Sequence, residues 1–179
     1  QEGYRLYCPR WVEARDKKTG EMLFQSKNLW VIMDMIKGRP ERPSYIDGRL
    51  PYVDPQLRHF DPALPKFPSE DEYNEGSFDS LKVHPTYYDT DYNRHVNNIS
   101  YIVWLMESFP HEYLDHNLPE FFDVEWKKQC HLGDEIRVET KKKENSEEYY
   151  TKILRKCEDG SEEIAFHGIT RWRKRVLDK

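Results

Sequence analysis

The sequence predicts an α+β fold in which one buried helix packs against an antiparallel sheet. Residues 99–106 are almost all apolar, which is typical of a helix that is buried on most sides. Residues 121–176 contain four strand-like segments separated by turns such as Asp159-Gly160. The aromatic content is 14%, and such side chains favour strands. One helix with several hairpins is an α+β layer arrangement.

The first 33 residues predict a β-hairpin. A strand over about 6–15 is followed by a turn that closes at Gly20 and by a second strand over about 21–33. A lone hairpin is only marginally stable, so its edges are expected to pair with further structure.

Residues 38–69 are expected to connect two structured parts and not to form a sheet. Most of the eleven prolines fall between Pro40 and Pro68, and proline removes backbone donors and restricts φ. The acidic run 69–75 that follows is interpreted as a solvated loop.

The second half begins with a predicted strand over about 77–83. A helix is expected over 98–108, because Asn97 and Asn98 are good N-cap residues and Pro110 lies just past its end. A loop over 114–119 follows. The four strands are then predicted over 121–130, 134–143, 148–156 and 164–176.

The polar segment before the helix carries Asp91, Asn93 and His95 at alternate positions. In an extended backbone these three side chains would share one face. A carboxylate, an amide and an imidazole on one surface are the groups of a general acid/base site. The N–H groups at the start of the helix could also polarise a carbonyl oxygen.

The same segment carries a family resemblance. It resembles the signature of the plant and bacterial acyl-ACP thioesterases, in which an Asp-x-Asn-x-His-Val-Asn-Asn motif leads into the buried helix of a hotdog fold. The matching residues are Asp91-Tyr-Asn93-Arg-His95-Val-Asn97-Asn98, Tyr101-Ile102, Trp104 and Glu107-Ser108. The resemblance implies hydrolysis of fatty acyl-acyl carrier protein to a free fatty acid, in fatty acid biosynthesis, and it implies no cofactor.

The resemblance also implies a domain organisation. Family members carry two tandem hotdog units, and residues 30–34 and 39–43 resemble the end of the first unit and its continuation. We therefore expect closing strands of a truncated first unit over 1–37, a Pro-rich linker over 38–76 and a complete hotdog unit over 77–179. A homo-oligomer, or pairing with a missing hotdog unit, is expected.

In the family, a Glu-Cys pair on the strand after the helix belongs to the active site. Here the pair is Gln129-Cys130, and Gln cannot act as a base, although it can orient a water molecule. Strand alternation allows only one of the two to face the site unless a bulge intervenes, and the apolar neighbours of Cys130 favour its side facing the helix. The candidates for substrate binding are Asn97, Asn98, Tyr101 and Trp104.

Two mechanisms remain open from the sequence. In the first, Asp91 or His95 activates a water molecule that Asn93 helps to position. In the second, the Cys130 thiolate attacks with His95 as its base. The first is preferred, because one short segment holds all its groups. Several residues also have a structural explanation: Asn93 and Asn98 as turn and cap residues, and His95, Cys130, Tyr101 and Trp104 as core residues.

Composition and charge limit which partners the chain is expected to bind. A net charge of −5 gives no reason to expect nucleic acid, and no apolar run approaches the roughly 18 residues of a membrane span. Three cysteines without Cys-x-x-Cys spacing predict free thiols in a reducing, cytoplasmic compartment and no metal site. The basic runs 141–143 and 171–175 are either docking surfaces for the acidic carrier protein or solvated strand ends.

Two other functions compete with this prediction. An acyl-CoA thioesterase of the hotdog class would differ in the carrier. A catalytically silent acyl-binding or assembly module would bind acyl chains without turnover that depends on His95.

Overall fold

The computed structural model describes residues 6–46 and 67–176. The chain divides into two compact units, Gln1–Phe67 and Pro68–Lys179. Residues 68–76, which the sequence places in the linker, thus group with the second unit. Residues 47–66 of the expected linker lie outside the described residues.

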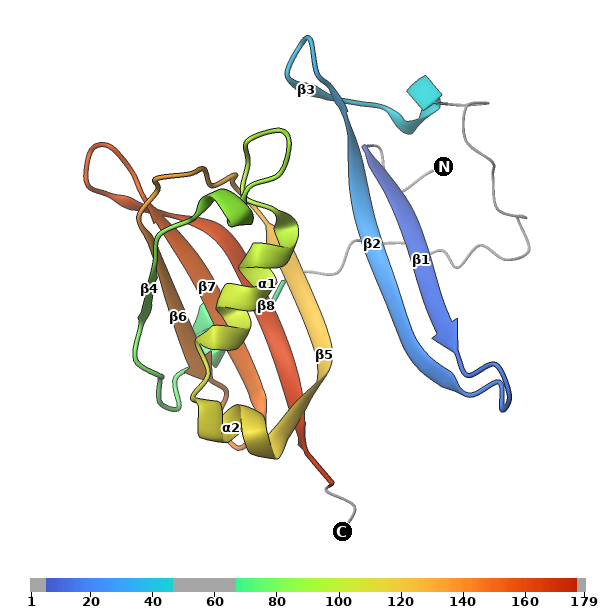
Figure 1. The fold of residues 1–179 in the computed structure, drawn as a ribbon, viewed down its shortest axis with the longest axis vertical. Helices are drawn as coiled ribbons and strands as arrows, with labels where there is room; N and C mark the ends of the chain where they lie inside the picture. Colours follow the sequence, from blue (N-terminus) through green and yellow to red (C-terminus); the bar gives the residue numbers. More distant parts are fainter. Residues whose placement is uncertain (1–5, 47–66, 177–179) are drawn as a thin grey trace. The chain divides into compact units, whose positions relative to one another are not determined.

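The first unit contains a three-stranded antiparallel sheet in the order β1-β2-β3 (Figure 1). Its strands are β1 (Tyr7–Arg15), β2 (Met22–Asp34) and β3 (Arg39–Glu41). The predicted hairpin is confirmed, with Tyr7 opposite Val31. The prediction that no strand follows Gly38 is wrong, because Pro40 pairs with Met33 in β3. Proline is compatible with a short strand at a sheet edge.

The second unit is a five-stranded antiparallel sheet in the order β4-β6-β7-β8-β5, with α1 across one face (Figure 1). Its elements are β4 (Leu81–Val83), α1 (Asn98–Glu107), α2 (His111–His116), β5 (Asn117–Trp126), β6 (Ile136–Lys142), β7 (Glu148–Lys156) and β8 (Glu162–Lys174). This is the arrangement expected for a hotdog unit, and β7 has the predicted bounds.

Several element boundaries differ from the prediction. Residues 114–119 are not a loop, because α2 runs to His116 and β5 begins at Asn117. Pro119 is accommodated where the pairing of β5 with β8 shifts register, which is a position that suits proline. The strand predicted over 77–83 is reduced to β4, and Ser77 makes only an isolated bridge to Lys141.

The core lies between α1 and the sheet. Tyr101, Trp104 and Leu105 are buried on the helix, and Leu105 packs closely over Gly168 of β8. A Cβ atom at Gly168 would lie 2.9 Å from Leu105 Cδ1, so the close packing requires glycine. The opposite side of α1 is open: Ile99 is 67% and Val103 45% exposed. The prediction of a helix buried on nearly every side is wrong there.

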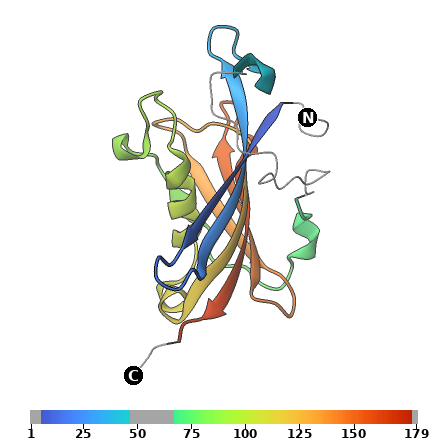
Figure 2. The same cartoon turned by 90° about the vertical axis from the view of Figure 1, so that its right-hand side faces the viewer.

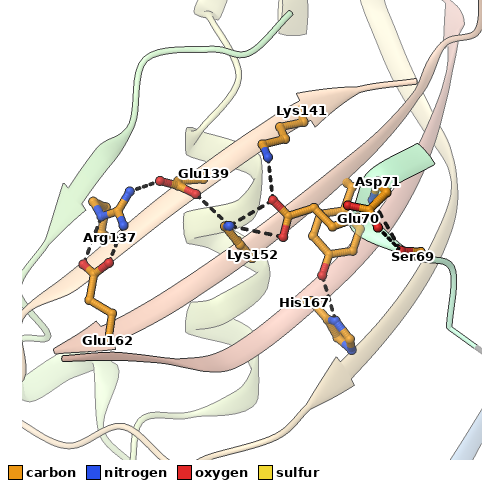
Figure 3. Close-up of polar contacts among 10 residues, drawn as sticks. Ser69, Glu70, Asp71, Arg137, Glu139, Lys141, Lys152, Glu162 and His167 are labelled. Atoms are coloured by element: carbon orange, nitrogen blue, oxygen red, sulfur yellow. Dashed lines mark hydrogen bonds and ion pairs between the residues drawn. The ribbon is translucent and has the colours of Figure 1, made fainter. Parts of the chain in front are cut away.

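The other face of the sheet is charged and is covered by a short segment. Figure 2 shows α1 on one side of the sheet and the 3₁₀ helix η3 (Glu70–Glu72) on the other. Glu70 accepts hydrogen bonds from Lys141 and Lys152, and Lys152 also contacts Glu139 (Figure 3). Tyr73 is 1% exposed. The prediction of a solvated loop over 69–75 is therefore wrong at Glu70 and Tyr73, whereas the other five residues of the run are exposed.

No helix of the described residues is long and apolar enough to cross a membrane.

Candidate active site

The polar segment before α1 forms a tight turn, so the predicted extended backbone is wrong. The Asp91 N–H donates to the His95 carbonyl at 2.8 Å, and the Arg94 N–H donates back to the Asp91 carbonyl at 3.0 Å. Arg94 has a φ of 64°, in the left-handed region. Asp91, Asn93 and His95 still lie together, but a turn brings them together and not strand alternation.

The Asp91 carboxylate organises this turn. Its Oδ1 accepts the Asn93 N–H at 2.8 Å and the His95 N–H at 3.3 Å, while Asn93 Nδ2 donates to Oδ2 at 3.4 Å. Asx turns of this type fix the backbone around them. Asp91 therefore holds both of the other candidates through backbone and side-chain contacts, and the His95 ring projects from a constrained turn.

The turn leads directly into α1. Val96 is buried, and Asn97 is the N-cap residue, whose side chain accepts the Ile99 N–H at 2.9 Å. The Asn97 carbonyl accepts the Ser100 N–H. The N–H groups of Ile99 and Ser100 are thus engaged within the helix start and are poor candidates to hold an oxyanion. The cap prediction for Asn97 is confirmed, and Asn98 is the exposed first residue of the helix.

A second turn, over residues 127–131, lies against the first. The Val96 N–H donates to the Cys130 carbonyl at 2.8 Å, and an isolated antiparallel bridge pairs His95 with His131. The strand predicted to reach Cys130 ends at Trp126, because the N–H groups of Lys127 and Lys128 both donate to the Ala165 carbonyl. That shared acceptor breaks the regular pairing.

Gln129 and Cys130 point in different directions. Cys130 is fully buried, and its N–H donates to the Tyr101 hydroxyl at 2.9 Å. Gln129 is exposed, and its carbonyl accepts a hydrogen bond from Arg155 Nη1 at 2.8 Å. The expectation that Cys130 faces the helix is confirmed, although the strand alternation that suggested it does not extend this far.

The environment of Cys130 disfavours a thiolate. Burial raises the pKa of the Cys130 thiol, and the hydrogen bond to Tyr101 offsets this only in part. Reactive cysteines lie in partly exposed sites that lower the thiol pKa. Cys130 has the opposite properties, those of a small core residue.

Tyr101 and Trp104 belong to the packed core. Tyr101 stacks on Phe166 with ring centroids 5.7 Å apart and lies 5.5 Å from the Trp104 ring. Burial raises the pKa of the Tyr101 phenol above its ordinary value, so it stays protonated. Its hydroxyl holds the Cys130 turn, a structural role that the sequence did not indicate.

The structure also brings His131 into the site. Its ring centroid lies 5.2 Å from that of His95, with the rings at 83° to each other. Nothing in the hydrophobic pattern marks His131. The only available signal was its place directly after Cys130 in the family's active-site segment.

A second titratable cluster lies on the outer face of the sheet. His167 Nε2 is 2.6 Å from Glu125 Oε2, and its Nδ1 is 3.1 Å from the Tyr150 hydroxyl. Burial raises the pKa of Glu125, but the hydrogen bond to His167 and the nearby Lys127 charge together outweigh burial and hold the pKa below its ordinary value. Alternate strand positions point to opposite faces, so this cluster is separate from Phe166 and Gly168 on the helix side.

No group of three or more potential metal ligands occurs among residues 6–46 and 67–176.

Comparison with solved structures identifies the fold. The structure resembles a 12:0-ACP thioesterase from Umbellularia californica (TM-score 0.69, 23% identity, 96% of this chain and 64% of that one). It also resembles an acyl-ACP thioesterase from Bacteroides thetaiotaomicron (TM-score 0.68, 21% identity, 95% of this chain and 64% of that one). The fold is therefore the hotdog fold of thioesterases.

Sequence comparison identifies the family. The family model for the acyl-ACP thioesterase C-terminal domain matches residues 72–174, more than half of the 179 residues. The chain therefore belongs to the acyl-ACP thioesterase family.

Two relatives show how much of a family member is present. The oleoyl-acyl carrier protein thioesterase 2 of Arabidopsis thaliana is 28% identical, over 92% of this chain and 51% of its own length. The dodecanoyl-[acyl-carrier-protein] hydrolase of Cinnamomum camphora is 27% identical, over 92% of this chain and 44% of its own length. The chain thus spans about half the length of the curated relatives that it matches.

Proposed function

We propose that this chain carries the catalytic groups of a thioesterase that hydrolyses fatty acyl-acyl carrier protein to a free fatty acid, as part of fatty acid biosynthesis. The observation that carries the proposal is the Asp91–His95 turn, which presents the family motif at the start of α1 inside the region matched by the family model. The curated relatives are named for acyl-carrier-protein substrates.

The proposed chemistry uses water as the nucleophile. His95 removes a proton from a water molecule, which attacks the thioester carbonyl. The Asn93 amide donates a hydrogen bond to the developing oxyanion. The intermediate collapses with cleavage of the C–S bond, and the imidazolium returns its proton to the leaving thiolate. Asp91 keeps the turn in shape, and Gln129, which is exposed beside the site, is proposed to orient the water.

The water route is supported over a Cys130 nucleophile by burial. Cys130 has no exposed surface and a raised thiol pKa, so a thioester carbonyl could not reach its sulfur without opening of the core. In this proposal the buried side chains of Cys130, Tyr101 and Trp104 form the core side of the site, whereas the exposed Asn97 and Asn98 line its entrance.

The carrier protein is proposed to dock at the C-terminal basic run. Each lysine of the other run, 141–143, forms an ion pair within the chain. Lys141 pairs with Glu70, and Lys142 pairs with Glu147. Lys143 pairs with both Glu72 and Glu148. Those charges are therefore compensated within the chain. Arg173, Lys174 and Arg175 are exposed at the end of β8 and could steer an acidic partner.

Pairing with a second hotdog unit is part of the proposal. β5 forms one edge of the five-stranded sheet, and Phe121, Phe122 and Trp126 on it are partly exposed. An exposed strand edge favours pairing with another strand. We place the reaction in a reducing compartment such as the cytoplasm, since the three cysteines are free thiols.

The test is release of free thiol from a panel of acyl-ACPs and the matching acyl-CoAs, by the parent chain and by the His95→Ala and Cys130→Ser variants. We expect turnover of acyl-ACP that falls by about 100-fold or more in His95→Ala, the usual size for loss of a general base, and is retained in Cys130→Ser. Equal loss in both variants would instead support a cysteine nucleophile. Preference for acyl-CoA would identify the other hotdog activity, and binding without turnover would identify a silent acyl-binding module.

A further inference from the structure

His131 is an imidazole in the site that the proposed mechanism does not use. It pairs with His95 across an antiparallel bridge, and the Val96 N–H···O=C Cys130 hydrogen bond flanks this pair. That pattern makes His95 and His131 a non-hydrogen-bonded pair. Side chains of such pairs lie on the same face and closer together than those of hydrogen-bonded pairs.

The turn that carries His131 is held at three consecutive residues by different elements. Arg155 from β7 donates to the Gln129 carbonyl, and Tyr101 from α1 accepts the Cys130 N–H. The His131 N–H donates to Asp134 Oδ2 at 2.8 Å. The backbone of His131 is therefore fixed relative to α1, and its exposed side chain lies beside the His95 ring.

The carboxylates near the His95–His131 pair are engaged in other hydrogen bonds. The Asp91 carboxylate accepts the N–H groups of Asn93 and His95, and Asp134 accepts the His131 N–H and lies 3.9 Å from Arg155. A catalytic histidine usually needs a third group that orients its ring. The ring contact that the structure shows for His95 is the edge-to-face contact with His131, at 5.2 Å and 83°.

We propose that His131 is a positioning residue, which holds the His95 imidazole in its productive orientation by edge-to-face packing. This inference rests on the proposed thioesterase activity. Edge-to-face pairs of aromatic rings are stabilising, so loss of the His131 ring lets the His95 ring reorient. The loss of His131 should therefore slow the chemical step and leave substrate binding unchanged, because the proposal assigns His131 no contact with the acyl chain.

The kinetic test compares His131→Ala, which removes the ring, with His131→Phe, which keeps a ring but no nitrogen. His111→Ala, an exposed histidine at the start of α2, is the matched control. We expect kcat to fall about 3- to 10-fold in His131→Ala with KM nearly unchanged, and to be largely restored in His131→Phe. An unchanged kcat in His131→Ala would overturn the inference, as would a His131→Phe variant as slow as His131→Ala.

A second measurement does not depend on activity. The parent should show a nuclear Overhauser effect between ring protons of His95 and His131, with the His95 signals assigned by their loss in His95→Gln. The His95 ring should also react faster with diethyl pyrocarbonate in His131→Ala than in the parent or in His131→Phe. Absence of both effects would overturn the placement. Both effects in a chain without turnover would instead mean that the proposed function is wrong while the positioning contact is real.

Discussion

The two faces of the five-stranded sheet are stabilised by different physics. On β7, Thr151 and Ile153 point toward α1 and are fully buried, whereas Lys152 between them points outward into a row of carboxylates. The helix side contains apolar side chains and a chain of hydroxyls in which Ser108, Thr140 and Thr151 are hydrogen-bonded. The outer side contains a network of ion pairs (Figure 3).

This difference indicates which face supports the candidate active site. Both turns of the site are anchored on the helix side, through buried Val96 and buried Cys130. Burial of an aliphatic side chain contributes about 1.5–3 kcal/mol, whereas a partly exposed ion pair contributes about 0–1 kcal/mol and is weakened by salt. The helix side should therefore supply most of the free energy of unfolding, and the outer face should make a smaller contribution.

The largest effect is expected for Ile153→Ala on the helix side. Removal of a fully buried isoleucine side chain should lower the free energy of unfolding by about 2–5 kcal/mol, because it loses apolar burial and leaves a cavity. Ile153→Val is the milder control, at about 0.5–1.5 kcal/mol. Urea unfolding followed by circular dichroism measures both. A loss below that of the valine control would contradict the dominance of this face.

Gly168→Ala tests the close approach of α1 to the sheet. The new methyl group would lie 2.9 Å from Leu105 Cδ1 and 3.1 Å from Val124 Cγ1, and overpacking of this kind costs about 1–3 kcal/mol. The same substitution in a Leu105→Val background should cost less, because the nearest atom is then absent. Equal costs in the two backgrounds, measured by urea unfolding, would show that Leu105 is not the obstacle.

Lys152→Met tests the outer face with a side chain of similar length. Glu70 keeps Lys141 as a partner and Glu139 keeps Arg137, so the expected loss of unfolding free energy is at most about 1 kcal/mol. The loss should shrink as NaCl rises from about 0.01 to 1 M, because salt screens such pairs. A larger loss that is independent of salt would show that the outer face contributes as much to stability as the helix side.

The smallest effect is a pH dependence that arises at Glu70. Burial raises the pKa of this carboxyl, but hydrogen bonds from Lys141 and Lys152 outweigh it and hold the pKa below its ordinary value. The stabilisation is present above the unfolded pKa of about 4.3 and is lost as pH falls through the lowered folded pKa. Glu70→Gln should thus be slightly less stable than the parent near neutral pH, by a few tenths to about 1 kcal/mol. The gap in urea midpoints should close as the pH falls through this lowered pKa; a constant gap would exclude this carboxyl as its source.

The elements of the second unit were largely predictable, because their signals are local. The helix begins at Asn98 after the predicted cap, and alternation places Ile136, Val138 and Thr140 on one buried face of β6. The outer side of β7 was less predictable. Tyr150 is buried there, because Tyr73 from the acidic segment lies against it. That contact joins residues far apart in the chain, and no local period encodes it.

The candidate site was predictable in its residues but not in its geometry. The motif identified Asp91, Asn93 and His95, yet their proximity comes from an Asx turn with Arg94 in the left-handed region. The depth of Cys130 depends on Tyr101, which reaches across from another element to accept its N–H.

By itself, the sequence determined approximately where the long strands of the second unit lie, where α1 begins and which family the motif resembles, but it did not reveal α2. Those features depend on side-chain period, capping and short motifs, all of which act within a few residues. Only the tertiary structure decided that Cys130 is sealed in the core, that His131 lies beside His95 and that residues 69–75 cover the outer face. Those outcomes depend on contacts between distant segments, whose partners are set by how the whole sheet packs.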